Sequence, residues 1–137
     1  MGASIKYEGD LSGKAVDVYQ NLQKNCYSIR SRETDTYGIV ISHEESVIIR
    51  DASFVVNENQ RQKVIEQERK NVHAFVRGHI SGAGEWDEEN HSDSVPVTYN
   101  PYECANFVHK ETGEPIESAE LVLLNEDGCF AFNINTN

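Results

Sequence analysis

Alternating apolar and polar positions recur along most of the chain and predict a protein built mainly from short strands. Between residues 26 and 56, apolar clusters are separated by polar, turn-forming runs. Short strands between such breakers are typical of an antiparallel meander. The expected strands cover residues 27–30, 37–42, 47–49, 54–56, 72–80, 95–99, 105–109, 121–124 and 130–134. The pattern therefore predicts an α+β fold dominated by antiparallel strands.

Residues 12–25 carry two competing patterns. Apolar side chains from Ala15 to Leu22 recur at i, i+3, i+4 and i+7, which favours a helix capped by Ser12. Two valines that alternate about Asp17 would instead suit a strand. We expect the helix.

The clearest helix follows at Asn57. Asn57 can cap its first turn, and Gln60 stands three residues later, as in a capping box. The propensity run continues to Asn71, with Arg69 and Lys70 in the last turn, where cations suit the helix dipole. Its apolar stripe is thin, so the helix is expected on the surface.

The chain length of 137 residues suits a single domain. Residues 81–94 are rich in glycine and acidic side chains, contain no lysine or arginine, and predict a mobile acidic loop. Residues 28–54 and 106–130 share a gapped pattern of strand, basic-Glu-Thr turn, strand, tight turn and strand. This pattern indicates either two related meanders or a chance similarity between them.

Charge and composition exclude several classes of protein. Twelve basic side chains face 23 acidic ones, for a net charge of −11, which disfavours direct binding of nucleic acid. No apolar run approaches the ~20 residues that span a bilayer, and residues 1–10 lack the pattern of a secretory signal. Three cysteines without a C-x-x-C pair are expected to be free thiols in a reducing cytoplasm.

A local excess of positive charge between Arg61 and His79 contrasts with this acidic background. In a strand over 72–80, strict alternation would put His73, Phe75, Arg77 and His79 on one face. An aromatic ring beside hydrogen-bond donors suits a base and a phosphate. The predicted anion site comprises Arg69, Lys70, His73, Phe75 and Arg77.

A structural role for the same residues is the alternative. Arg69 and Lys70 would then only complement the end of the helix, and Arg77 would pair with the acidic loop at 81–94 or with a buried acid.

Recognisable catalytic patterns are absent from the sequence. It contains no G-x-S-x-G, P-loop or G-x-G-x-x-G motif, and its five histidines lack the spacing of metal ligands. The carboxylates of residues 87–89 fit a solvated loop better than an acid/base pair. We therefore expect no metal and no cofactor, and a binding protein rather than an enzyme.

Two segments, residues 70–78 (KNVHAFVRG) and 99–102 (YNPY) with Phe107-Val108, resemble blocks in small uncharacterised proteins of bacteriophages and related mobile elements. The resemblance covers residues 16–134 and transfers no catalytic residue. It implies an accessory protein that acts in the cytoplasm of a host cell by binding, either to a host defence protein or to a signalling nucleotide.

Three functions follow from these observations. The first is a counter-defence protein that sequesters a nucleotide-like anion at the predicted site. The second is an acidic inhibitor that mimics nucleic acid and blocks a host nuclease or another DNA-binding defence protein. The third is an enzyme without a recognisable motif. A structural role in a virion and a homo-oligomeric state are left open.

Overall fold

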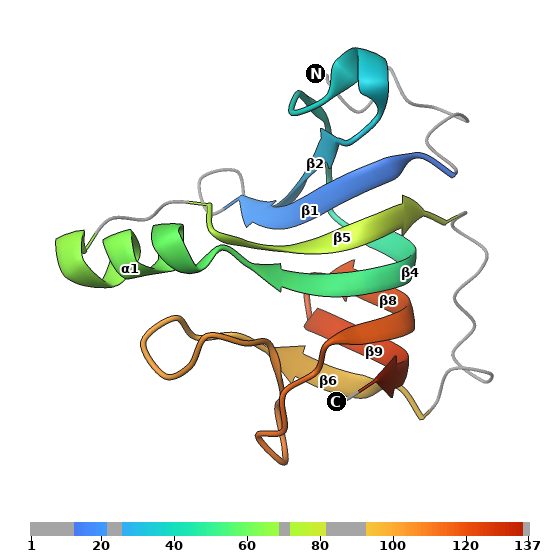
Figure 1. Ribbon diagram of the computed structural model, residues 1–137. Helices are drawn as coiled ribbons and strands as arrows, with labels where there is room; N and C mark the ends of the chain where they lie inside the picture. Colours follow the sequence, from blue (N-terminus) through green and yellow to red (C-terminus); the bar gives the residue numbers. More distant parts are fainter. Residues whose placement is uncertain (1–12, 22–25, 69–71, 82–92, 136–137) are drawn as a thin grey trace.

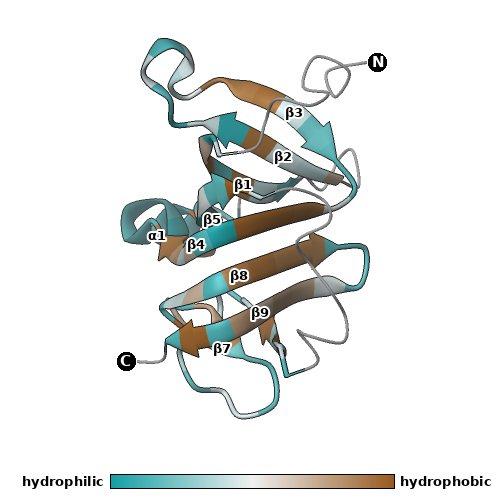
Figure 2. Ribbon diagram, turned by 90° about the vertical axis from the view of Figure 1, so that its right-hand side faces the viewer, coloured by the Kyte–Doolittle hydropathy of each residue, from teal (hydrophilic) through white to brown (hydrophobic). Residues whose placement is uncertain are grey.

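The computed structural model describes residues 13–21, 26–68, 72–81 and 93–135 of the chain. It confirms a β-rich α+β fold, in which every described strand belongs to one antiparallel sheet of order β3-β2-β1-β5-β4-β8-β9-β6-β7 (Figures 1 and 2). The elements are β1 (Ala15–Asn21), β2 (Cys26–Ser31), the 3-10 helix η2 (Thr34–Thr36), β3 (Val40–Glu44), β4 (Val47–Val56), α1 (Glu58–Gln67), β5 (Ala74–Ile80), β6 (Val95–Thr98), β7 (Val108–His109), β8 (Ser118–Asn125) and β9 (Gly128–Asn135).

The sheet curls around a core formed by its inner face. The Tyr27 hydroxyl of β2 donates to the backbone oxygen of Asn125 at 2.8 Å, although β1, β5 and β4 separate β2 from β8 in the sheet. Buried residues from both halves of the sheet meet inside this curl. They are Val16, Val18, Ile29, Ile41, Val47, Ile49, Ala52, Val76, Ile80, Val97, Ile116, Ala119, Val122, Leu124 and Ala131.

The helix expected in residues 12–25 is wrong, because the described part of this segment is strand β1. Val16 and Val18 are almost fully buried, and Tyr19 points to the opposite face with Asp17. Pairing with β2 on one side and β5 on the other satisfies the backbone of β1 in the middle of the sheet. The two-residue alternation therefore outweighs the helical spacing.

The strands expected at 47–49 and 54–56 form one strand, β4. The Arg50–Asp51 segment is a bulge rather than a turn, and Asp51 has a φ of 50°. The facing residue on β5 is Gly78, where an added Cβ would lie 2.7 Å from the backbone oxygen of Arg50. The bulge of β4 thus packs so closely against β5 that only a residue without a side chain fits at position 78.

The connection from β3 to β4 departs from the predicted meander. β3 pairs with β2 at one end of the sheet, whereas β4 lies between β5 and β8 in its middle. The proposed repeat would match residues 47–54 of the single strand β4 with residues 121–130, which span the β8–β9 hairpin. The two copies therefore do not have the same topology, which favours chance similarity.

Helix α1 begins as the sequence predicts and ends four residues earlier. The backbone N–H of Gln60 donates to Oδ1 of Asn57 at 3.1 Å, so Asn57 is the N-cap. Glu68 adopts a left-handed φ of 53° and ends the helix before Arg69 and Lys70. Placing these two cations in the last turn is therefore wrong, and both lie outside the described residues.

The acidic segment also lies mostly outside the described residues, which resume at Asp93. The mobile loop at 81–94 thus stays a prediction. Within the described part of the chain, no helix has the length and apolar character needed to cross a membrane.

Candidate functional site

Three charged side chains line up across the outer face of β2, β1 and β5. Because side chains alternate along a strand, Asp17 points away from the core when its neighbours Val16 and Val18 point into it. The strand register sets Arg30 of β2 and Arg77 of β5 directly opposite Asp17. A carboxylate thus stands between two arginines on adjacent strands, the arrangement that stabilises cross-strand pairs.

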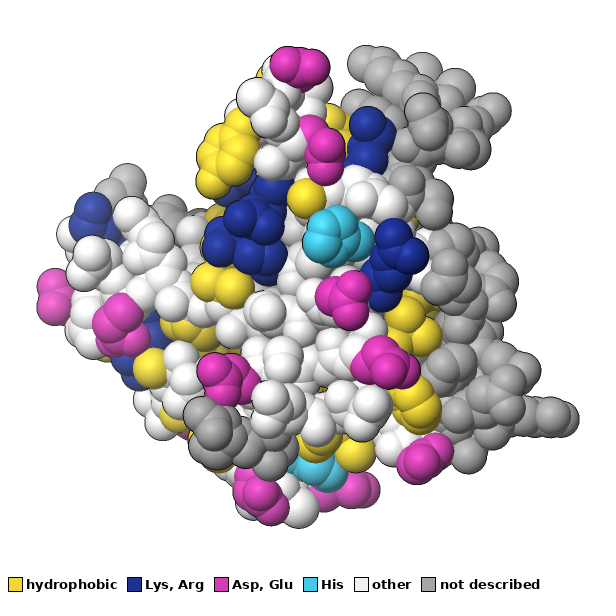
Figure 3. Space-filling model, turned by 45° about the vertical axis from the view of Figure 1, so that its right-hand side comes forward, with side chains coloured by type: hydrophobic (Ala, Val, Ile, Leu, Met, Phe, Trp, Pro, Cys, Tyr) yellow, Lys and Arg dark blue, Asp and Glu magenta, His cyan; other side chains and the backbone are white. Residues whose placement is uncertain are grey.

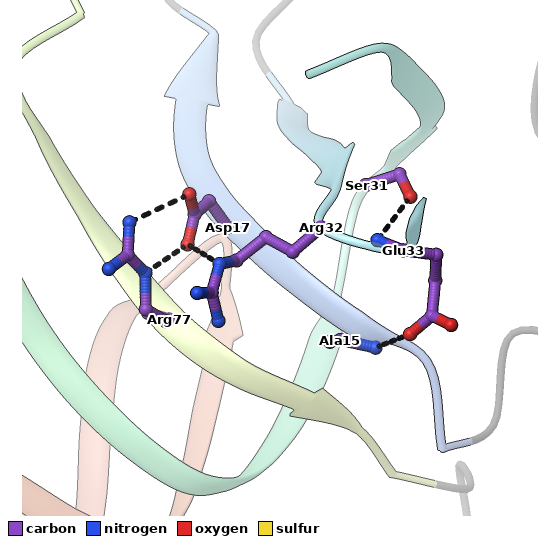
Figure 4. A network of polar contacts seen from close by, with 6 residues as sticks. All are labelled: Ala15, Asp17, Ser31, Arg32, Glu33 and Arg77. Atoms are coloured by element: carbon purple, nitrogen blue, oxygen red, sulfur yellow. Dashed lines mark hydrogen bonds and ion pairs between the residues drawn. The ribbon is translucent and has the colours of Figure 1, made fainter. Parts of the chain in front are cut away.

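Arg77 is firmly paired with Asp17 (Figure 4). Its Nε donates to Oδ1 of Asp17 at 2.9 Å and its Nη2 donates to Oδ2 at 3.3 Å. This hydrogen bonding raises the pKa of Arg77. The Asp17 side chain is only 12% exposed, so the two-pronged contact offsets the cost of burying its charge. The structural alternative for Arg77 is thus confirmed as pairing with a buried acid, and the acid is Asp17 of β1 rather than a residue of the acidic loop.

Arg32, just beyond the end of β2, reaches the same carboxylate with a looser contact. Its Nε lies 3.9 Å from Oδ1 of Asp17, an ion-pair distance but too long for a hydrogen bond (Figure 4). The Nε atoms of both Arg30 and Arg32 are buried and lack a hydrogen-bond partner among the described residues. Arg77 and Arg32 therefore contact the Asp17 carboxylate, Arg30 stands opposite Asp17 in the strand register, and Arg30 and Arg32 each keep one donor unsatisfied. We call Asp17, Arg30, Arg32 and Arg77 the arginine cluster.

Aromatic rings border the arginine cluster. The Arg30 guanidinium lies 5.2 Å from the centre of the Tyr19 ring, and the Arg77 guanidinium lies 5.4 Å from that of Phe75. Tyr37, which is 67% exposed, is close enough to act electrostatically on Arg77. Figure 3 shows basic side chains gathered on this face with hydrophobic side chains on either side of them. The cluster thus combines surplus positive charge with flat apolar surface.

The structure divides the residues that the sequence assigned to one anion site. Phe75 and Arg77 lie together in the arginine cluster region. His73 precedes β5 and makes its contact elsewhere, since its Nε2 lies 2.8 Å from the Tyr99 hydroxyl. The alternation that was predicted to bring His73 to the same site does not hold, because β5 begins only at Ala74.

Sequence reasoning missed the other three residues of the arginine cluster, including Asp17, the partner of Arg77. Asp17, Arg30 and Arg32 lie 60, 47 and 45 positions before Arg77 in the numbering, so no local motif connects them. The available signal was the alternation in residues 15–21 and 26–31, which marks Asp17 and Arg30 as outward-facing once both segments are read as strands. Their proximity still depends on β1 lying between β2 and β5.

A second region is formed by aromatic side chains near the end of β4. The Phe107 ring stacks on Tyr99 and contacts Phe54, each with ring centres 5.0 Å apart. His73 joins them through Tyr99, with ring centres 5.4 Å apart. Burial raises the pKa of Tyr99 to about 12. We call Phe54, His73, Tyr99 and Phe107 the aromatic cluster.

A pocket of about 620 Å³ adjoins the aromatic cluster and is lined by residues 54–56, 105–107 and 115–117. Its lining holds Phe54 and Phe107 but no basic side chain, and its one charged residue is Glu117. This chemistry is unsuited to an anion. Among the described residues, the lining of this pocket carries no basic side chain, whereas the arginine cluster carries three.

Other groups with catalytic potential are poorly placed for chemistry. Cys129 packs against the core, and burial raises the pKa of its thiol to about 12, so it is not a nucleophile at neutral pH. Cys26 and Cys104 are free and half-buried. Over the described ranges, no three His, Cys, Asp or Glu side chains gather closely enough to hold a metal ion.

The fold and the site define a β-rich protein whose outer sheet face carries surplus arginines between aromatic rings. A family model described as Mycobacterium phage L5 gene 82 protein matches residues 10–132. The chain is also 34% identical over 122 residues to the Gene 82 protein of Mycobacterium phage L5, covering 85% of this chain and 94% of that relative. The chain therefore belongs to the family of the Mycobacterium phage L5 gene 82 protein, which supports the expected phage context. No solved structure matches it.

Proposed function

We propose that this phage protein is a non-enzymatic accessory protein that sequesters a nucleotide-like anionic molecule at the arginine cluster. The observation that carries the proposal is the pair of buried Nε donors of Arg30 and Arg32 without hydrogen-bond partners. A buried donor left unpaired costs about 1–3 kcal/mol, so an anion that satisfies it is bound with that advantage.

The surroundings of these donors favour a nucleotide over a simple anion. The planar guanidinium group of an arginine can donate two hydrogen bonds to two oxygens of a phosphate. The rings of Phe75 and Tyr37 offer surface on which a base can stack. In this arrangement Arg77 holds the site together through Asp17, and Arg30 with Arg32 contact the ligand. The role first expected of Arg77 thus passes to two other arginines.

A counter-defence role fits this chemistry and the phage family. A protein that binds a signalling nucleotide without reacting with it removes the signal from the host by mass action. We propose that it does so in the host cytoplasm. Native mass spectrometry of the protein purified from infected cells tests this role, and a retained nucleotide-sized molecule is the expected result.

Calorimetry on the full chain tests the binding site itself. The titrants are mono-, di- and cyclic nucleotides, and the proteins are wild type, Arg32→Ala and Lys63→Ala. Arg32→Ala should weaken binding by about 1.5–3 kcal/mol, a tenfold to hundredfold loss, because charge-assisted hydrogen bonds disappear. Lys63→Ala removes the same charge from the exposed surface of α1 and should leave affinity unchanged.

Two results would overturn the proposal. Equal losses in both variants would mean that only net charge matters, not the cluster. An absence of heat with every nucleotide would remove this function in favour of the acidic inhibitor of a DNA-binding protein, which the net charge of −11 suits.

A further inference from the structure

We infer that the pocket beside the aromatic cluster binds an extended peptide segment of another protein. The peptide pairs as an added strand with the end of β4 and carries an apolar and a basic side chain. The pocket shares no residue with the arginine cluster, so the inference goes beyond the proposed function. Three features of the pocket support it: a backbone edge that β8 leaves open, an apolar wall beside this edge, and a single carboxylate.

The end of β4 has no neighbour on the side of β8. The two strands stay in register up to Phe54, whose backbone N–H donates to the oxygen of Glu117 at 3.0 Å. Beyond this point the chain that precedes β8 leaves β4, because the N–H of Ile116 donates to the oxygen of Phe107 at 2.9 Å. Among the described residues, none takes the place opposite Val56 on this side. The pocket lies between the two diverging segments, since both of them line it.

Val56 directs its backbone hydrogen-bonding groups toward this open side. Its register partner on β5 is Ala74, and the next pair is hydrogen-bonded, because the N–H of Asn57 donates to the oxygen of His73 at 2.7 Å. Hydrogen-bonded and non-hydrogen-bonded pairs alternate in an antiparallel ladder, so the N–H and C=O of Val56 point away from β5. In the described part of the chain no backbone group pairs with them. An extended peptide can donate one hydrogen bond to Val56 and accept another, as when a strand is added to the edge of a sheet.

The walls of the pocket favour particular side chains on this peptide. Side chains of residues directly opposite each other on two strands lie on the same face, so the peptide residue facing Val56 points to the face that holds Phe54. The rings of Phe54 and Phe107, with centres 5.0 Å apart, provide an apolar wall for it. Glu117 is exposed and is the one charged residue of the lining, so it favours a basic side chain next to the apolar one.

The test titrates the full chain with three synthetic peptides. They are acetyl-Lys-Val-Phe-Val-Lys-amide, its fully N-methylated form, and acetyl-Gln-Val-Phe-Val-Gln-amide. The N-methylated peptide keeps every side chain but cannot donate from its backbone, and it should bind about tenfold more weakly than the first peptide. The glutamine peptide should bind about threefold more weakly, the usual effect of losing an exposed ion pair.

Two protein variants test the carboxylate. Glu117→Gln should reduce the preference for the lysine peptide over the glutamine peptide toward unity, because the ion pair is then absent. Glu120→Gln removes the same charge from an exposed position of β8 outside the pocket and should preserve the preference. An equal change in both variants would mean that only net charge matters, and would overturn the assignment of Glu117.

Amide hydrogen exchange locates the peptide on the protein. In the free protein the N–H of Val56 should exchange faster than that of Val55, which pairs with Phe75 of β5. The lysine peptide should slow the exchange of Val56. Unchanged exchange of Val56, equal affinity of the N-methylated peptide, or no binding of the lysine peptide at about 1 mM would each overturn the inference. None of these results bears on nucleotide binding at the arginine cluster, so the proposed function is tested separately.

Discussion

Arg77 of the arginine cluster follows His73 of the aromatic cluster by only four positions, yet the chemistry of the two clusters differs. In the aromatic cluster, His73 meets the Tyr99 hydroxyl and Tyr99 stacks on Phe107, so its polar atoms have partners. In the arginine cluster, one carboxylate pairs with the guanidinium groups of Arg77 and Arg32, and Nε of Arg30 and of Arg32 are unsatisfied among the described residues. The capacity to bind a ligand thus follows from unmatched polar groups rather than from residue type.

The largest expected effect separates the paired arginine from the unpaired ones. Arg77→Ala should lower the free energy of unfolding by about 1–3 kcal/mol, because Asp17 is then left buried with its main partner gone. The measurement is urea denaturation. Arg30→Ala is the matched comparison and should change stability by no more than about 0.5 kcal/mol, since its Nε gives up no hydrogen bond.

Arg77→Ala and Arg30→Ala together test whether the paired and the unpaired arginine really differ in their contribution to stability. Equal destabilisation by Arg77→Ala and Arg30→Ala would mean that the cluster is a structural unit without a free donor. Arg77→Ala combined with Asp17→Asn supplies the control, because removing both charges should recover part of the lost stability.

A smaller effect is expected in the aromatic cluster. Tyr99→Phe keeps the stacking on Phe107 and removes the hydrogen bond to His73, so unfolding should become easier by about 0.5–1.5 kcal/mol. Nucleotide affinity should stay the same, because the substitution leaves every side chain of the arginine cluster in place. A loss of nucleotide affinity in Tyr99→Phe would show that the two regions are not independent.

The smallest effect is a dependence of stability on alkaline pH. The raised pKa of Tyr99, about 12 against an ordinary 10, means that the folded protein keeps this proton longer than the unfolded chain does. The Tyr99 contribution to stability is therefore complete below pH 10 and is lost as the pH rises from 10 toward 12. Comparing the slopes of wild type and Tyr99→Phe in this range measures it, and identical slopes would contradict the assignment.

Local patterns predicted much of the fold. The N-cap at Asn57, the strand ending at Ile80 and the later strands at 95–99, 121–124 and 130–134 correspond to observed elements. Each rests on short-range propensity or capping, which a sequence displays directly. By contrast, β1 was predicted as a helix, because the sequence of this segment fits both a helical and a strand pattern. The strand forms because β2 and β5 pair with β1 on its two sides and satisfy its backbone.

The candidate site was only half predictable. Phe75 and Arg77 were identified from strand alternation, but the partner of Arg77 lies 60 positions away in β1. Pairing at that range depends on the order of strands in the sheet, which alternation within one strand does not contain. His73 was assigned to the wrong cluster because the alternation was extended one residue beyond the start of β5.

Nuclear magnetic resonance of the arginine Nε–Hε groups tests the central claim most directly. On addition of adenosine 5′-monophosphate, the Nε–Hε signals of Arg30 and Arg32 should shift, because these groups acquire a hydrogen-bond partner. The signal of Arg77, already bonded to Asp17, should move little, and that of Arg61, which donates to the Pro101 backbone oxygen, should not move. Unchanged Arg30 and Arg32 signals at saturating nucleotide would contradict the account.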